Sequence, residues 1–254
     1  MFTVVVVNSK GGAGKTTLAT NLASYYAKSG YKVALKDYDS QGSSGFWQQR
    51  RSKDLNPIQI IPMYKDVVGS TASYVRHPER GTDYLIIDSP SGIDAVQFKP
   101  ILEQADAILI PVLPSSIDIH AVSRFIAALL LKAKVSRQHN ALAVIANRAK
   151  KSTLVYRKLE KFLQTLGIPF IATLRDTQNY IKASEAGMGV MDMSGEALFK
   201  DHKSWEGVFA FIENLKSAQA MPSHCSSPAH NAELAKSTSK ALRDIDRQQG
   251  VPSV

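Results

Sequence analysis

The chain has 254 residues, of which 44% are hydrophobic, and its formal net charge is +9. This length and composition are typical of one α/β domain with a sizeable core. No apolar run approaches the ~20 residues of a membrane-spanning helix, and the first residues lack a signal-peptide pattern, so we expect a cytoplasmic protein. Cys225 is the only cysteine, which excludes an intrachain disulfide and a cysteine set for an iron–sulfur cluster.

A strand, a glycine loop and a helix are predicted at the start of the chain. Thr3–Val7 is a β-branched run suited to a buried parallel strand, and Leu18–Lys28 has helical periodicity. Residues 8–17 between them read Asn-Ser-Lys-Gly-Gly-Ala-Gly-Lys-Thr-Thr, and Gly14–Thr16 matches the end of the pattern G-x-x-x-x-G-K-[ST]. In such a loop, backbone N–H groups bind phosphates, the lysine reaches the β- and γ-phosphates, and the hydroxyl group binds Mg²⁺.

Lys10 is a second lysine in this loop, and Ser9 stands where the common pattern has its first glycine. The loop resembles the deviant Walker A motif of the ParA/MinD family of ATPases, K-G-G-x-G-K-[ST]-[ST]. The resemblance implies that Lys10 reaches the phosphates of the partner subunit in an ATP-dependent homodimer, as an arginine finger does. A solvated loop lysine is the alternative. The expected nucleotide-binding loop residues are Lys10, Gly11, Gly12, Ala13, Gly14, Lys15, Thr16 and Thr17.

An acidic segment follows the apolar residues Val33–Leu35. Residues 37–44 read Asp-Tyr-Asp-Ser-Gln-Gly-Ser-Ser and resemble the family's D-x-D-P-Q-G switch, with serine in place of proline. The resemblance implies that Asp39 positions the attacking water and that Asp37 supports the metal and the switch. Carboxylates suit both roles, although at strand ends they also form helix caps and turns. With the loop lysines, the expected catalytic residues are Lys10, Lys15 and Asp39.

Tyr84–Asp88 is an apolar run that ends in an acid and looks like a Walker B strand. The resemblance implies that Asp88 holds Mg²⁺ through water. The expected metal site is therefore formed by Thr16, Asp37 and Asp88, and the expected cofactors are ATP and Mg²⁺.

Further strands are predicted at Ala107–Val112 and Leu142–Asn147, with a closing strand near Ile168–Phe170. Strands that alternate with helices indicate a mostly parallel central sheet flanked by helices, with ligands at the carboxyl ends of the strands. Asn147 stands where the family has its adenine-recognising asparagine, although a turn asparagine is equally compatible with the pattern.

Positive charge is concentrated between Arg124 and Lys182, where twelve basic and two acidic residues give +10 against −1 for the rest of the chain. A salt-sensitive surface for the phosphate backbone of nonspecific double-stranded DNA is the functional interpretation. A basic face that only maintains solubility is the alternative. The expected DNA-binding residues are Arg148, Lys150, Lys151, Arg157, Lys158 and Lys161.

The chain becomes polar near residue 217, so we expect an ATPase domain over residues 1–216 and a tail over 217–254 that is disordered or partner-dependent. Asn231–Gln249 could form a helix, but its few large apolar side chains do not suit a membrane anchor.

The resemblance implies a short ParA-type ATPase that binds nucleoid DNA and positions or partitions a cargo, with hydrolysis stimulated by a cargo-bound partner protein. The segment after the switch resembles that of stand-alone ParA-like proteins that distribute cytoplasmic cargo, including the McdA group that positions carboxysomes. The residues that carry this resemblance are Ser43, Ser44, Trp47 and Arg51. The alternatives are a MinD-like protein that cycles on the membrane and a metabolic ATP-dependent enzyme of the same superclass.

Overall fold

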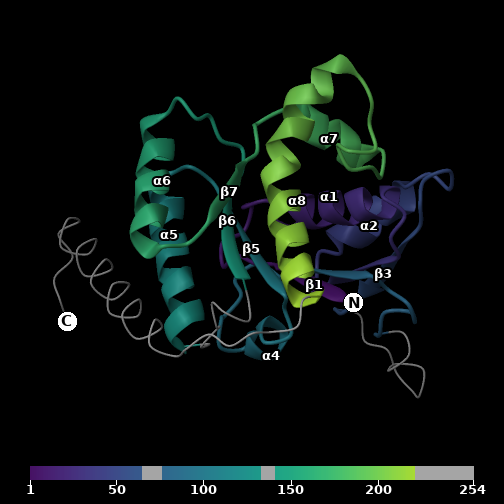
Figure 1. Cartoon of the computed structure of the whole chain (residues 1–254), viewed down its shortest axis with the longest axis horizontal. Helices are drawn as coiled ribbons and strands as arrows, with labels where there is room; N and C mark the ends of the chain where they lie inside the picture. Colours follow the sequence, from purple (N-terminus) through teal and green to yellow (C-terminus); the bar gives the residue numbers. More distant parts are fainter. Residues whose placement is uncertain (65–75, 133–140, 221–254) are drawn as a thin grey trace.

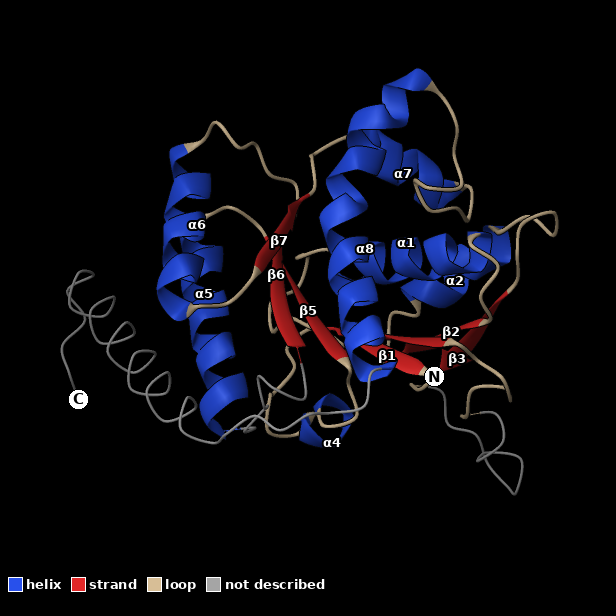
Figure 2. Cartoon of the chain, in the orientation of Figure 1, coloured by secondary structure: helices blue, strands red, loops and turns tan. Residues whose placement is uncertain are grey.

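The computed structural model describes residues 1–64, 76–132 and 141–220, in which seven parallel strands form one sheet in the order β3-β2-β4-β1-β5-β6-β7. Figure 2 shows this twisted sheet passing through the middle of the molecule. The expected mostly parallel central sheet is confirmed, and the expected strands are all present. The strands are β1 (Phe2–Val6), β2 (Val33–Asp37), β3 (Ile58–Pro62), β4 (Tyr84–Asp88), β5 (Ala107–Val112), β6 (Ala141–Ala146) and β7 (Phe170–Thr173).

Helices cover both faces of the sheet. One face packs against α4, α5 and α6, and the other packs against α1, α2, α7 and α8 (Figure 1). The α-helices are α1 (Lys15–Lys28), α2 (Ser43–Arg50), α4 (Lys99–Leu102), α5 (Ser116–Ala127), α6 (Leu154–Leu166), α7 (Gln178–Glu185) and α8 (Phe199–Ala220). A π-helical turn at Ala128–Lys132 continues α5, and a 3-10 turn at Glu196–Leu198 precedes α8.

The β-branched first strand shows why both faces are apolar. Val4 and Val6 pack into the core beneath α1 and α8, whereas Val5 and Val7 pack into the core beneath α4, α5 and α6. Side chains alternate between the two faces of a strand, and both faces are covered here, so β1 is apolar on both sides except at the buried Thr3.

The final helix α8 continues to Ala220, past residue 216, where we expected the ATPase domain to end. The rest of the expected tail, including Cys225 and the possible helix Asn231–Gln249, lies outside the described residues. None of the helices within the described ranges is long and apolar enough to cross a membrane.

Candidate nucleotide site

The loop between β1 and α1 is held in place by hydrogen bonds from a buried asparagine. Asn8 donates from Nδ2 to the carbonyl oxygen of Pro111 at 2.7 Å, and its Oδ1 accepts from the N–H of Lys10 at 3.0 Å. Gly12 and Gly14 have φ of 75° and 94°, a left-handed conformation that side chains rarely adopt. The sequence pattern therefore forms a fixed loop at the N-terminus of α1, where backbone N–H groups and the helix dipole favour a phosphate.

Lys15 lies in the first turn of α1, and only 6% of its surface is exposed. Its Nζ donates to the carbonyl oxygen of Lys10 at 3.4 Å, so the side chain folds back across the loop. Burial lowers the pKa of Lys15, while the charges of Asp88 and Asp39 act in the opposite direction. A buried ammonium group that faces carboxylates at a phosphate loop is placed to bind the negative charge of a nucleotide.

Asp37 and Asp88 lie side by side because β2 and β4 pair in parallel with these two residues in register. Both side chains are fully buried. Asp37 accepts from the N–H of Asp39 at 2.9 Å and from the N–H of Ser44 at 3.2 Å, while the hydroxyl of Ser44 donates to Asp88 Oδ2 at 3.3 Å. The structure thus brings together two of the three predicted metal-site residues, and Ser44 bridges them.

Burial raises the pKa of Asp88 to about 7, and the nearby Asp37 charge adds to the rise. A hydrogen bond from the side chain of Thr16 and the charge of Lys15 oppose it. The third predicted metal-site residue, Thr16, therefore lies within hydrogen-bond reach of the Asp88 carboxylate. The cluster combines two carboxylates, the hydroxyls of Thr16 and Ser44, and one ammonium group.

The residues of this cluster suit Mg²⁺. Asp88 Oδ1 is buried without a hydrogen-bond partner in the described part of the chain, as expected for an oxygen that faces a cation or its water. Residues 1–64, 76–132 and 141–220 contain no group of three or more His, Cys, Asp or Glu side chains that could hold a metal by themselves. Mg²⁺ ordinarily takes one or two carboxylates together with substrate phosphates and water, so a dedicated cage is not required.

Asp39 begins the turn before α2 and is half-buried. Its Oδ1 accepts from the N–H of Gln41 at 3.0 Å, and its charge is close enough to act on the pKa of Lys15. The side chain therefore lies beside the phosphate loop, as its predicted role requires.

Lys10 forms an ion pair with Asp118 in the first turn of α5. The Lys10 side chain is 38% exposed and that of Asp118 is 8% exposed. The carboxylate also accepts from the hydroxyl of Ser115, whose Oγ in turn accepts from the N–H of Asp118 at 3.0 Å. Lys10 is thus held at the carboxyl edge of the sheet by a contact within its own subunit, while part of its side chain remains exposed to solvent.

Asn147 follows β6 and is 4% exposed. Its Nδ2 donates to the carbonyl oxygen of Ala13 at 2.9 Å, and its Oδ1 accepts from the N–H of Arg148 at 3.0 Å. The side chain therefore supports the phosphate loop directly, in addition to any contact with a base. It also lines a cavity of about 260 Å³, together with Thr17 and residues from the start of α7.

Arg148 lines this same cavity, and its φ of 49° is left-handed. Non-glycine residues adopt this conformation rarely, often at functional sites. Arg148 therefore lies at the nucleotide end of β6, where it lines the cavity and is also exposed to solvent.

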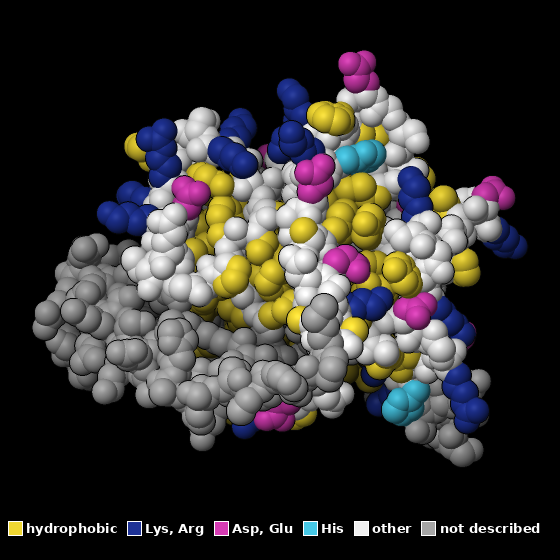
Figure 3. Space-filling view, in the orientation of Figure 1, with side chains coloured by type: hydrophobic (Ala, Val, Ile, Leu, Met, Phe, Trp, Pro, Cys, Tyr) yellow, Lys and Arg dark blue, Asp and Glu magenta, His cyan; other side chains and the backbone are white. Residues whose placement is uncertain are grey.

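The remaining predicted DNA-binding residues are all exposed on α6 and on the loop before it: Lys150, Lys151, Arg157, Lys158 and Lys161. Opposite them, Tyr156, Leu159 and Leu163 are buried. In Figure 3, dark blue Lys and Arg side chains gather around the α6 end of the molecule. The helix therefore presents an apolar face to the sheet and a basic face to solvent.

Sequence reasoning assigned no role to Ser44 or Asp118. The sequence places Asp118 at the opening of a helix, and the pattern Ser115-x-x-Asp118 is typical of a capping box there. It could not reveal the contact with Lys10, which joins segments that are far apart in the sequence.

The comparisons with known proteins agree with this geometry. Residues 4–190 match the family model described as the CobQ/CobB/MinD/ParA nucleotide binding domain. "Maintenance of carboxysome distribution protein A" from Halothiobacillus neapolitanus is 29% identical over 193 residues, which cover 76% of this chain and 88% of that protein.

Two solved structures show the same fold. The MinD cell division protein of Aquifex aeolicus has a TM-score of 0.60 at 21% identity and covers 89% of this chain and 100% of its own. Cyanothece McdA in complex with ATP has a TM-score of 0.59 at 18% identity and covers 89% of this chain and 99% of its own. The phosphate loop, the paired carboxylates and these matches lead to one conclusion: the chain belongs to the CobQ/CobB/MinD/ParA family of nucleotide-binding proteins.

Proposed function

We propose that this protein is a ParA-type ATPase that dimerises with ATP, binds nonspecific DNA and positions or partitions a cellular cargo. The observation that carries the proposal is the placement of Lys10 beside the phosphate loop, ion-paired with Asp118 at the carboxyl edge of the sheet. This second lysine is 38% exposed, so its side chain can reach beyond its own subunit. It is available to move to a nucleotide.

ATP hydrolysis is supported by the cluster around Asp88. Lys15 would bind the β- and γ-phosphates, Thr16 and Asp88 would hold Mg²⁺, and Asp39 would orient the attacking water. The metal would neutralise charge that develops on the phosphates. The protein's own contribution is to bury these groups and to fix them with hydrogen bonds. Groups held in place before the reaction stabilise the charge of the transition state without having to reorganise.

Dimerisation is supported by the Lys10–Asp118 pair. In a homodimer closed over ATP, Lys10 would exchange its carboxylate partner for a phosphate of the opposite nucleotide. A partly exposed ion pair contributes little, so a phosphate oxygen can compete for the lysine. ATP would then control assembly because it supplies the competing anion.

DNA binding is supported by the exposed basic face of α6. Phosphate contacts of this kind carry no sequence information and weaken steeply with salt. Stronger binding of DNA by the ATP dimer than by the ADP state would give a nucleotide-controlled switch on the nucleoid.

The cargo is proposed from relatives. The chain is 29% identical to a protein named for maintenance of carboxysome distribution and 25% identical, over 187 residues, to the chromosome-partitioning ATPase Soj of Thermus thermophilus. A carboxysome, a plasmid or chromosome, or another complex would carry the partner protein that stimulates hydrolysis.

The test measures retention on nonspecific duplex DNA with Mg²⁺ and either ATP or ADP, at low and moderate salt. Lys10→Ala is compared with wild type, and Lys53→Ala removes an exposed lysine away from the site as the matched control. We expect ATP-dependent, salt-sensitive retention in wild type and in the control but not in Lys10→Ala. Absence of retention in every state would refute the DNA-binding proposal. Binding to anionic vesicles instead would then favour a membrane-cycling protein, and hydrolysis stimulated by a small molecule would favour a metabolic enzyme.

A further inference from the structure

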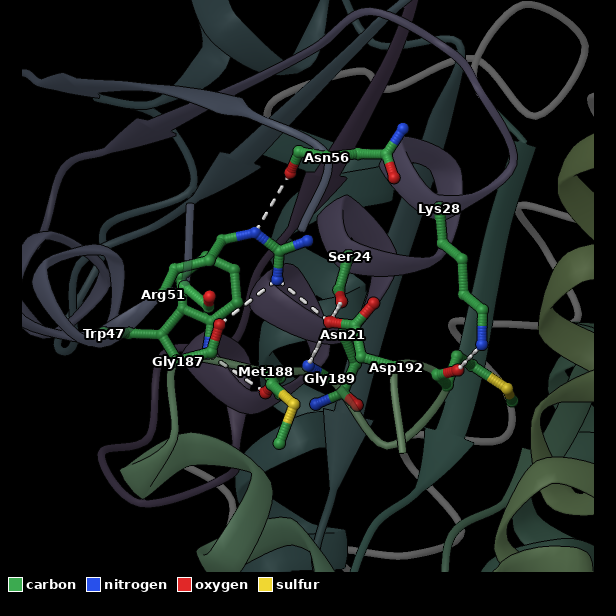
Figure 4. A network of polar contacts seen from close by, with 12 residues as sticks. Asn21, Ser24, Lys28, Trp47, Arg51, Asn56, Gly187, Met188, Gly189 and Asp192 are labelled. Carbon is green, nitrogen blue, oxygen red and sulfur yellow. Dashed lines mark hydrogen bonds and ion pairs between the residues drawn. The ribbon is translucent and has the colours of Figure 1, made fainter. Parts of the chain in front are cut away.

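A buried ion pair lies behind the nucleotide site, where α2 ends. Arg51 donates from Nη1 to Asp192 Oδ2 at 2.9 Å, and the two side chains are 3% and 1% exposed. Arg51 also donates to the carbonyl oxygens of Asn56 and Gly187, both at 3.1 Å. Figure 4 shows the guanidinium group enclosed between these acceptors.

Asp192 connects this pair to α1. Its Oδ2 accepts from the N–H of Gly189 at 3.0 Å and from the hydroxyl of Ser24 on α1 (Figure 4). Trp47 on α2 donates from Nε1 to the carbonyl oxygen of Met188 at 3.1 Å. The loop after α7 is therefore tied to both α1 and α2.

The backbone at this junction leaves no room for adjustment. A Cβ on Gly187 would lie 2.2 Å from the backbone nitrogen of Arg51, and a Cβ on Gly189 would lie 2.7 Å from the Cβ of Ser24. Gly187 also has a φ of +63°. These close approaches fix the distance between the loop and the two helices.

The helices α1, α2 and α7 that are joined at this ion pair each extend to the nucleotide site at their opposite ends. Thr16 and Thr17 open α1, and Ser44, in the first turn of α2, bonds to Asp37 and Asp88. The start of α7 lines the cavity beside Asn147, and the three helices together line a cleft of about 540 Å³.

We infer that Arg51 and Asp192 are positioning residues for ATP hydrolysis. They hold α2 against α1 and the loop after α7, and so keep Ser44 bridging the two buried carboxylates. This inference rests on the proposed hydrolysis at that site.

Stability alone does not account for the pair. Arg51 Nη2 and Asp192 Oδ1 are buried without hydrogen-bond partners in the part of the chain that the structure describes. A partly satisfied buried ion pair is often no more stable than apolar residues of similar volume. The hydrogen bonds of the pair are directional. They hold α2 in one orientation, whereas apolar contacts would allow several.

The test replaces the pair by apolar side chains, Arg51→Met with Asp192→Leu, so that no buried charge is left unpaired. We expect an unchanged or higher urea midpoint and an unchanged affinity for an ATP analogue. We expect kcat to fall by about tenfold or more with little change in KM, because misplacement of catalytic groups by about 1 Å costs up to about 100-fold. The matched control is Lys32→Gln with Glu79→Gln, which removes a 3.0 Å ion pair at the other end of β2.

A second readout does not depend on hydrolysis. The chain has two tryptophans, and Trp47 lies against Arg51, with the guanidinium 5.4 Å from its ring. We expect Mg²⁺ and ATP to change the emission of wild type but not that of Trp47→Phe, and we expect the double variant to bind ATP without this change.

A double variant that folds with wild-type kcat and wild-type emission change would show that the pair is only structural. Asp192→Asn, which keeps an acceptor for Ser24 and Gly189, is measured in parallel and decides the question by the same readouts if the double variant does not fold. If wild type hydrolyses no ATP, the proposed function fails and the positioning role in hydrolysis fails with it; the emission response then tests only whether the pair orients α2 towards bound ATP.

Discussion

Asp88→Asn should stabilise the nucleotide-free protein at high pH while it abolishes Mg²⁺-dependent hydrolysis. Burial raises the pKa of Asp88 from 3.8 to about 7. The folded state therefore holds a proton between these two values that the unfolded state has lost, so folding stability falls as the pH rises from about 4 to 7. An asparagine is never charged and removes this penalty.

The expected size follows from the two pKa values. A rise from 3.8 to about 7 corresponds to a destabilisation of about 4 kcal/mol at pH 8, at about 1.4 kcal/mol per pKa unit. At pH 5 less than half of this penalty is present, since the folded carboxyl is still protonated. The stabilisation by Asp88→Asn should therefore be roughly 2 to 3 kcal/mol larger at pH 8 than at pH 5.

Urea unfolding of both proteins at pH 5 and pH 8, with a chelator present, measures this difference. Effects of pH on other groups appear in both proteins and largely cancel. A difference of roughly 2 to 3 kcal/mol moves the urea midpoint by about 1 M. Equal stabilisation at the two pH values would refute the reasoning, because it would show that Asp88 is not held protonated by burial.

Three further predictions concern the loop, the lysine and the basic helix. Gly14→Ala should lose ATP binding by about tenfold or more, because its Cβ would lie 2.0 Å from Asn147 Nδ2 at a φ of +94°. Calorimetric titration measures this, and Gly30→Ala, with a similar φ but open space, should bind normally. Asp118→Asn should release Lys10 and strengthen ATP-dependent dimerisation by no more than about fivefold. Sedimentation through a density gradient or light scattering measures the dimer, and weaker dimerisation would contradict the exchange of partners. The last variant replaces three exposed basic residues of α6 with alanine: Arg157, Lys158 and Lys161. The slope of log K for DNA binding against log salt concentration should become shallower by about 3, and an unchanged slope would exclude this face as the DNA-binding surface.

The sequence by itself determined the local chemistry of the phosphate loop. The β-branched run before it, the helical run after it and the glycines within it are neighbours in the chain, so their pattern fixes a strand, a tight turn and a helix N-terminus. The same holds for Asp88, because an apolar strand that ends in an acid places that acid at the carboxyl edge of a parallel sheet. The predicted strands were confirmed for this reason.

The contacts between distant segments were decided only by the tertiary structure. Asp37 lies beside Asp88 because β2 pairs with β4, and Lys10 meets Asp118 because β1 pairs with β5, the strand before α5. No local pattern encodes which strands become neighbours, since all of them are apolar runs of similar length.

The same limit applies to Arg148 and to the Arg51–Asp192 pair. Charge counting grouped Arg148 with the basic residues of α6 but did not reveal that this residue, in a left-handed turn after β6, also lines the nucleotide cavity. The sequence marked Arg51 only through a family resemblance and did not mark Asp192, and burial turns the two into a tie between α2 and the loop after α7. A side chain's burial depends on what packs over it, and that is a property of the assembled fold.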